Sequence, residues 1–141
     1  MAVITSSAKE TKELAKKMAK DLRGGEILAL YGDLGAGKTA FVQGLAQGLG
    51  IRRPVTSPTF VIIRPYKGAV LTLYHIDLYR IRDVGEVRDL GVEEILKDKK
   101  AVLAIEWPEK MESLLPRART MKIHFEWLGE NTRRITLENY E

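Results

Sequence analysis

The chain has 141 residues, 45% hydrophobic and 30% charged, which is enough apolar material for the core of a single domain spanning residues 1–141. A net charge of +4 suits a partner that carries phosphates, but it does not by itself indicate nucleic acid. The absence of cysteine excludes disulfides and thiolate metal sites, and no apolar run has the length of a membrane span, so we expect a cytoplasmic protein.

The first predicted elements are a helix, a strand and a second helix. Apolar side chains recur at helical spacing over residues 7–23, where Ser7 and Glu10 fit a capping box. Residues 26–31, EILALY, are short and apolar, which predicts a buried strand. Residues 38–49 again carry apolar side chains on one helical face. This order is typical of an α/β protein.

The middle of the chain predicts a hairpin followed by broken helices. Two β-rich runs flank Lys67 and Gly68, which predicts an antiparallel hairpin. Pro65 places the first of these runs at a sheet edge or a strand end, because proline has no N–H for the ladder. Residues 83–100 predict short, interrupted helices.

The last third predicts a central strand and a second hairpin. Residues 101–106, AVLAIE, are apolar on both faces, as in a central parallel strand. Residues 108–115 predict a short helix, and residues 120–140 alternate as two strands around residues 129–131. The expected fold is therefore an α/β sandwich of the P-loop NTPase type. Its mixed sheet has a parallel centre and antiparallel margins and is flanked by helices.

Residues 32–39, GDLGAGKT, match the P-loop pattern G-x-x-x-x-G-K-[ST] at every fixed position. Glycines let the backbone approach an anion, and the N-terminus of the following helix adds its positive end. Lys38 would reach the β- and γ-phosphates, and the Thr39 hydroxyl would reach Mg²⁺. The residues expected to contact the nucleotide here are Asp33, Leu34, Gly35, Ala36, Gly37, Lys38, Thr39 and Ala40.

Two acidic residues end predicted strands. Glu106 closes an apolar run of the Walker B form, with Glu in the usual place of Asp, and Asp77 closes LTLYHID. Ligands of open α/β sheets bind beyond the carboxyl ends of the strands, and Mg²⁺ prefers carboxylate and other oxygen ligands. We therefore predict Lys38, Asp77 and Glu106 as catalytic residues, and Thr39 and Glu106 as Mg²⁺ ligands. Trp107 either walls the site or only packs.

Other polar residues are less decisive. In TSPTF, Thr56 and Thr59 fit either a loop that senses the γ-phosphate or an ordinary proline turn. We assign structural roles to His75 and His124, because no second ligand lies at metal spacing. A guanine-reading Asn-Lys-x-Asp segment is missing, which favours ATP. The arginines nearest in sequence that could neutralise a γ-phosphate are Arg64 and Arg80.

Four segments together resemble the TsaE family, small bacterial P-loop ATPases of threonylcarbamoyladenosine synthesis in tRNA. They are GDLGAGKT, TSPTF, HIDLYR and IEWPE, within a resemblance that spans about residues 5–140. The resemblance implies a helper ATPase with ATP and Mg²⁺ as cofactors. It also implies association with the TsaB–TsaD heterodimer, which modifies position 37 of tRNAs that read codons starting with adenine. Contact with tRNA would be indirect, and we expect a monomer when the protein is free.

The same resemblance implies roles for single residues. Lys38 and Thr39 would hold phosphate and Mg²⁺, and Glu106 would belong to the Mg²⁺ site. Asp77 would be the essential acid of the DLYR segment. Thr56 and Thr59 would belong to a switch-like loop, and Trp107 follows the acid as in the family pattern.

Two alternatives stay open. A small-molecule kinase needs an arginine-bearing lid, and residues 81–100 contain Arg82 and Arg88. A nucleotide-gated binding module would hold ATP without useful turnover.

Overall fold

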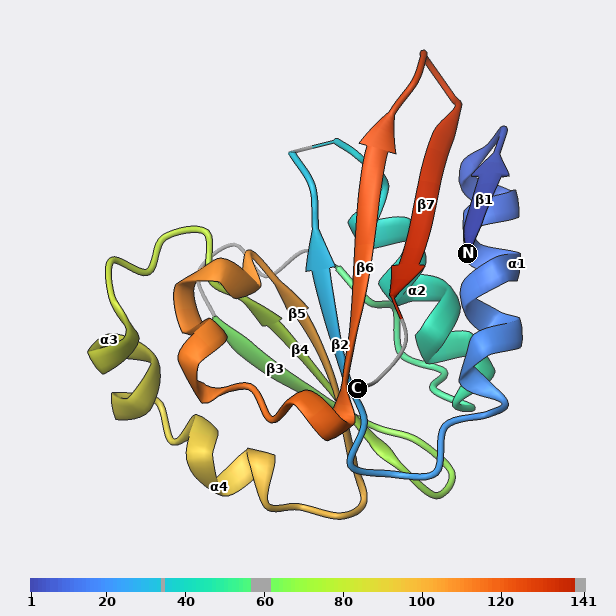
Figure 1. Ribbon diagram of the computed structural model, residues 1–141. Helices are drawn as coiled ribbons and strands as arrows, with labels where there is room; N and C mark the ends of the chain where they lie inside the picture. The colour runs from blue at the N-terminus through green and yellow to red at the C-terminus, as the bar shows by residue number, and fades with distance from the viewer. Residues whose placement is uncertain (34, 57–61, 139–141) are drawn as a thin grey trace.

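The computed structural model describes residues 1–33, 35–56 and 62–138, which form a seven-stranded sheet with helices on both faces (Figure 1). The strand order is β1-β7-β6-β2-β5-β4-β3. The strands are β1 (Ala2–Thr5), β2 (Ile27–Tyr31), β3 (Ile63–Lys67), β4 (Thr72–Asp77), β5 (Ala101–Glu106), β6 (Thr120–Trp127) and β7 (Arg133–Glu138).

The sheet is parallel at its centre and antiparallel at its margins. Strand β2 pairs in parallel with β5 and β6, and β5 pairs in parallel with β4. The pairs β3–β4, β6–β7 and β1–β7 are antiparallel. The mixed α/β sheet and both hairpins are therefore confirmed. Strand β3, which contains Pro65, lies at the sheet edge as the proline predicts.

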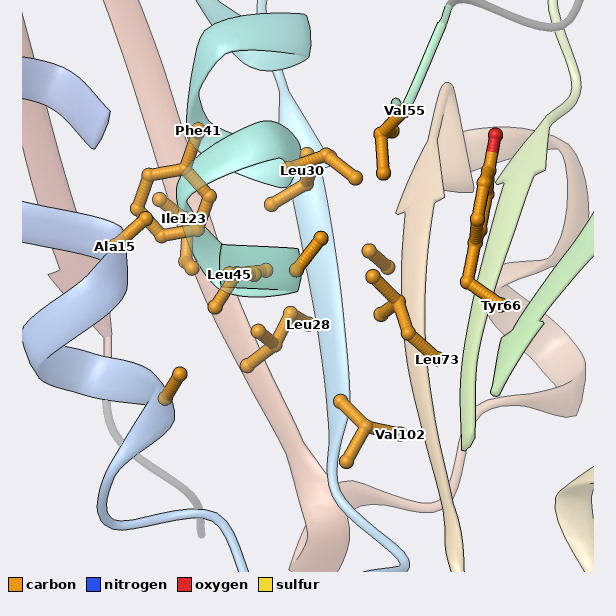
Figure 2. Packing of buried hydrophobic residues seen from close by; sticks show 14 of the residues in the cluster. Ala15, Leu28, Leu30, Phe41, Leu45, Val55, Tyr66, Leu73, Val102 and Ile123 are labelled. Carbon is orange, nitrogen blue, oxygen red and sulfur yellow. The ribbon is translucent and has the colours of Figure 1, made fainter. Parts of the chain in front are cut away.

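The helices cover the two faces of the sheet separately. Helices α1 (Ala8–Ala19) and α2 (Lys38–Gly48) pack on one face, and Figure 2 shows Phe41 and Leu45 of α2 beside Leu28 and Leu30 of β2. The other face carries α3 (Val84–Asp89), α4 (Val92–Leu96) and the 3₁₀ helix η1 (Pro108–Leu114), and the short 3₁₀ turn η2 (Arg117–Arg119) precedes β6. Burial of both faces explains why every residue of β5 is buried.

The capping box of α1 is present, with one difference. The Ser7 hydroxyl accepts a hydrogen bond from the Glu10 N–H at 3.1 Å, as predicted. The Glu10 carboxylate accepts from the N–H of Ser6, one residue before the N-cap, also at 3.1 Å. Two backbone donors that the helix itself cannot satisfy are thereby paired.

Some elements differ from the prediction. Strand β1 was not predicted, because four residues carry little periodicity and this strand pairs with β7 at the far end of the chain. The short helix predicted over residues 108–115 is the 3₁₀ helix η1, which ends at Leu114 and is interrupted at Met111, where φ is −139°. Strand β3 begins only at Ile63, and residues 57–61 of the predicted run lie outside the described residues. None of the described helices combines the length and the apolar character needed to cross a bilayer.

Helices α1 and α2 approach so closely that we expect Gly44→Ala to lower the free energy of unfolding by about 1–3 kcal/mol. A Cβ atom at Gly44 would overlap the Lys12 carbonyl oxygen and lie 2.9 Å from the Ala15 Cβ. Alanine gains about 1 kcal/mol in helix propensity over glycine, but this gain is smaller than the expected cost of the overlap. Urea denaturation measures the difference. Gly129→Ala is the control, because its added Cβ meets nothing within 4 Å. Equal stability of Gly44→Ala and wild type would show that the two helices can move apart freely.

Candidate nucleotide-binding site

The predicted P-loop connects β2 to α2. Gly32 has φ of 146°, and a Cβ there would lie 2.7 Å from the Phe125 carbonyl oxygen, so any side chain would disturb this position. Gly37, the N-cap of α2, is left-handed with φ of 99° and forms no side-chain cap. The first N–H groups of α2 therefore lack a side-chain acceptor at their N-cap, which is the arrangement that suits an anion.

Lys38, the first residue of α2, turns back over this loop. Its ammonium donates a hydrogen bond to the Gly32 carbonyl at 2.6 Å and lies 4.3 Å from the centre of the Trp107 ring. Burial lowers the pKa of Lys38, and the nearby carboxylates of Glu106 and Asp77 oppose that shift. The residue is only 4% exposed. A buried cation is thus held at the loop, where a phosphate could replace its present contacts.

Asp77 and Glu106 end neighbouring parallel strands and face each other in register. Glu106 is buried, and Asp77 is only partly exposed and accepts a hydrogen bond from the Tyr79 N–H at 3.0 Å. Burial raises the pKa of Asp77, and the Glu106 charge raises it further. The sheet therefore brings together the two acids that the sequence singled out, and both act electrostatically on Lys38.

His75 is a further member of this group. Its Nε2 lies 2.5 Å from Oε2 of Glu106, and its side chain is fully buried. The sequence did indicate that His75 lies near Asp77, because it precedes Asp77 by two residues and so shares its strand face. The sequence could not show that Glu106 lies across from it, because strand order is not readable from one strand.

Trp107 both walls the site and packs. Its ring covers the Lys38 ammonium and contacts Tyr79 at 5.3 Å between ring centres. It is the one non-glycine residue with positive φ among those described, with φ of 60° and ψ of 49°. Such a backbone costs of the order of 1–3 kcal/mol and persists where the surroundings enforce it. The sharp turn after Glu106 directs the ring over the loop.

Arg133 of β7 contacts the loop. It donates a hydrogen bond to the Gly35 carbonyl at 3.1 Å and others to the carbonyls of Gly129 and Thr132 at 2.9 and 3.1 Å. Its side chain also lies 3.6 Å from the place of a Cβ at Gly37. Sequence proximity had pointed to Arg64 and Arg80. No local signal marks Arg133, because the contact spans 98 residues.

The remaining predicted residues lie around this centre or outside the description. Thr39 and Ala40 are in the first turn of α2, Asp33 is exposed after β2, and Thr56 is exposed before the residues that are not described. Leu34 and Thr59 lie outside the described residues.

The described residues contain no group of three or more His, Asp or Glu side chains able to hold a metal alone. Thr39 and Glu106 would supply only two protein oxygens. This small set suits Mg²⁺, which commonly keeps several waters and completes its shell with substrate phosphates.

Three comparisons relate the chain to known proteins. The family model described as Threonylcarbamoyl adenosine biosynthesis protein TsaE matches residues 5–135. The tRNA threonylcarbamoyladenosine biosynthesis protein TsaE of Bacillus subtilis (strain 168) is 46% identical over 132 residues, 94% of this chain and 81% of that protein. The protein of the same name from Treponema pallidum (strain Nichols) is 39% identical over 137 residues, 97% of this chain and 99% of that one. A solved structure, titled Crystal structure of Bacillus subtilus YdiB, superposes with a TM-score of 0.74 at 36% identity, covering 97% of this chain and 83% of its own.

Proposed function

The chain belongs to the TsaE family of tRNA threonylcarbamoyladenosine biosynthesis, and from this we propose that it is an ATPase that binds ATP with Mg²⁺. Hydrolysis of ATP would support repeated turnover of the TsaB–TsaD complex, which modifies position 37 of tRNAs that read codons starting with adenine. The observation that carries the proposal is the gathering of Lys38, Asp77 and Glu106 against a glycine-rich loop at the ends of parallel strands.

Binding would rest on the loop and on α2. The N–H groups of residues 33–40 would surround the phosphates, and Lys38 would exchange the Gly32 carbonyl for phosphate oxygens. Trp107 would cover the ammonium and limit access of water. Thr56 and Thr59 are proposed to respond to the γ-phosphate.

Glu106 and Asp77 would have different roles in hydrolysis. Thr39 and Glu106 would hold Mg²⁺, which when bound neutralises charge on the β- and γ-phosphates. Asp77 lies beside Glu106 in the sheet, and its carboxylate would orient the attacking water. The burial that raises the pKa of Asp77 makes this carboxylate a better proton acceptor than an exposed aspartate.

The kinase alternative finds little support in the fold. The segment expected to serve as its mobile lid forms α3 and α4, which bury Val87, Val92 and Leu96 against the sheet. The nucleotide-gated module shares every residue of the proposed site and differs only in turnover.

The test of this function measures ADP and inorganic phosphate from the purified chain with its TsaB–TsaD partner. We expect equal amounts of both products over many turnovers, without a small-molecule acceptor. A single slow turnover would favour the gated module, and phosphate found on an added small molecule would favour the kinase.

Variants of the two acids are expected to differ in kind. Glu106→Gln should raise the Mg²⁺ concentration for half-maximal hydrolysis by about 10-fold or more and lower the rate, because it removes a charged ligand. Asp77→Asn should keep nucleotide affinity and lower turnover by about 10²-fold or more, because an amide is a poor proton acceptor. Calorimetry with and without Mg²⁺ separates the two effects. Equal loss of Mg²⁺-dependent binding in both variants would assign both acids to one metal site.

A further inference from the structure

The hydrogen bond between His75 and Glu106 has a defined geometric origin. In the parallel β4–β5 pair, His75 lies opposite Ala104, and Asp77 lies opposite Glu106. These four residues share one face of the sheet, so His75 is the diagonal neighbour of Glu106. Ala104 has only a methyl group on this face, which leaves space for the imidazole to lean toward Glu106. Both partners lie on interior strands of the sheet, His75 on β4 and Glu106 on β5, and both side chains are buried.

The hydrogen bond also has a defined direction. A carboxylate oxygen can only accept, so Nε2 of His75 carries the hydrogen. Nδ1 is buried and has no partner among the described residues. The imidazole is 0% exposed, so bulk water does not compete for its donor. Within the described part of the chain, the donor function of His75 is therefore directed at a single atom, Oε2 of Glu106.

Oε2 of Glu106 thereby already accepts a hydrogen bond, which favours coordination of a cation by the other oxygen, Oε1. We propose that His75 is a positioning residue that restricts Glu106 to one-oxygen coordination and so sets a preference for Mg²⁺ over Ca²⁺. The inference rests on the proposed function, in which Glu106 contacts the metal. Mg²⁺ takes six ligands at short distances, whereas Ca²⁺ takes six to eight and often binds both oxygens of one carboxylate. Coordination by both oxygens would make the cation share Oε2 with the buried His75 donor, and weakening the hydrogen bond of a buried donor is costly.

The test compares three substitutions of His75. His75→Phe keeps the ring volume and removes the donor. His75→Gln can place an amide N–H near the position of Nε2, whereas the shorter His75→Asn places its amide near Nδ1, out of reach of Glu106. Because the two amides are chemically alike, they form a matched pair. For each protein, calorimetry gives the ATP affinity in EDTA and at increasing Mg²⁺ or Ca²⁺, and thermal unfolding gives the stability.

We expect His75→Phe and His75→Asn to raise the Mg²⁺ concentration for half-maximal strengthening of ATP binding by about 10–100-fold, as for other residues that orient a metal ligand. The Ca²⁺ concentration should change less, so that the preference for Mg²⁺ shrinks. His75→Gln should retain most of the wild-type preference for Mg²⁺. ATP affinity in EDTA, which depends on the P-loop alone, should stay within a few-fold of wild type in each folded variant.

The outcomes separate this inference from the proposed function. If ATP binding by the wild type does not respond to Mg²⁺, the proposed metal site fails. If the wild type responds and His75→Phe retains its Mg²⁺ and Ca²⁺ curves, the positioning role is overturned. Should His75→Phe not fold, the amide pair decides, and an equal metal preference in His75→Gln and His75→Asn would overturn the proposal as well.

Discussion

Lys38→Ala is expected to abolish measurable ATP hydrolysis and to weaken ATP binding by about 10–100-fold. The affinity figure follows from hydrogen bonds to charged groups, which contribute about 1.5–3 kcal/mol. The hydrolysis rate should fall further, by about 10²–10³-fold or more, because the ammonium opposes charge that develops in the transition state. Calorimetry and a phosphate-release assay measure the two effects separately.

The same substitution should change stability little. The buried ammonium gains a hydrogen bond to the Gly32 carbonyl and a cation–π contact with the Trp107 ring. It also loses hydration, and this loss lowers the pKa of Lys38. Alanine removes both the contacts and the cost of burial, so the two changes oppose each other. Lys97→Ala is the control, since Lys97 is exposed at the end of α4. Unchanged nucleotide affinity in Lys38→Ala would remove the P-loop assignment.

Saturating TsaB–TsaD heterodimer is expected to accelerate ATP hydrolysis by as much as about 10³–10⁵-fold, the effect of an arginine that neutralises the γ-phosphate in related enzymes. Arg133 lies against the loop, but its guanidinium donates to the carbonyls of Gly35, Gly129 and Thr132. It therefore holds the β6–β7 hairpin to the P-loop. We expect the partner either to supply a cation or to free Arg133 from these carbonyls.

The measurement titrates the purified heterodimer into the chain at fixed ATP and follows phosphate release and complex formation together. Arg133→Ala separates the two sources of charge. If the partner supplies the cation, this variant should retain most of the acceleration; if the partner frees Arg133, the variant should bind the partner and lose the acceleration. A wild-type rate of phosphate release that does not change while partner binding saturates would contradict acceleration by the partner and favour the nucleotide-gated module.

The sequence by itself was sufficient for the features that short segments encode. The P-loop pattern at residues 32–39 specifies its own turn, because glycines at fixed positions permit the left-handed backbone seen at Gly37. The capping box of α1 follows from two side chains three residues apart, the hairpin positions from turn residues between β-rich runs, and the edge placement of β3 from the missing N–H of Pro65. The four segments that indicated the TsaE family are likewise local, and the family match confirms that reading.

Only the tertiary structure decided which distant residues meet. The hydrogen bond from His75 to Glu106 spans 31 residues, and that from Arg133 to Gly35 spans 98. Strand β1 exists only because β7 offers it a pairing edge. The left-handed backbone of Trp107 is unfavourable in isolation and needs packing to hold it. The long-range contacts depend on strand order and register, which no single segment encodes, because bringing distant residues together costs chain entropy that only the packed tertiary structure offsets.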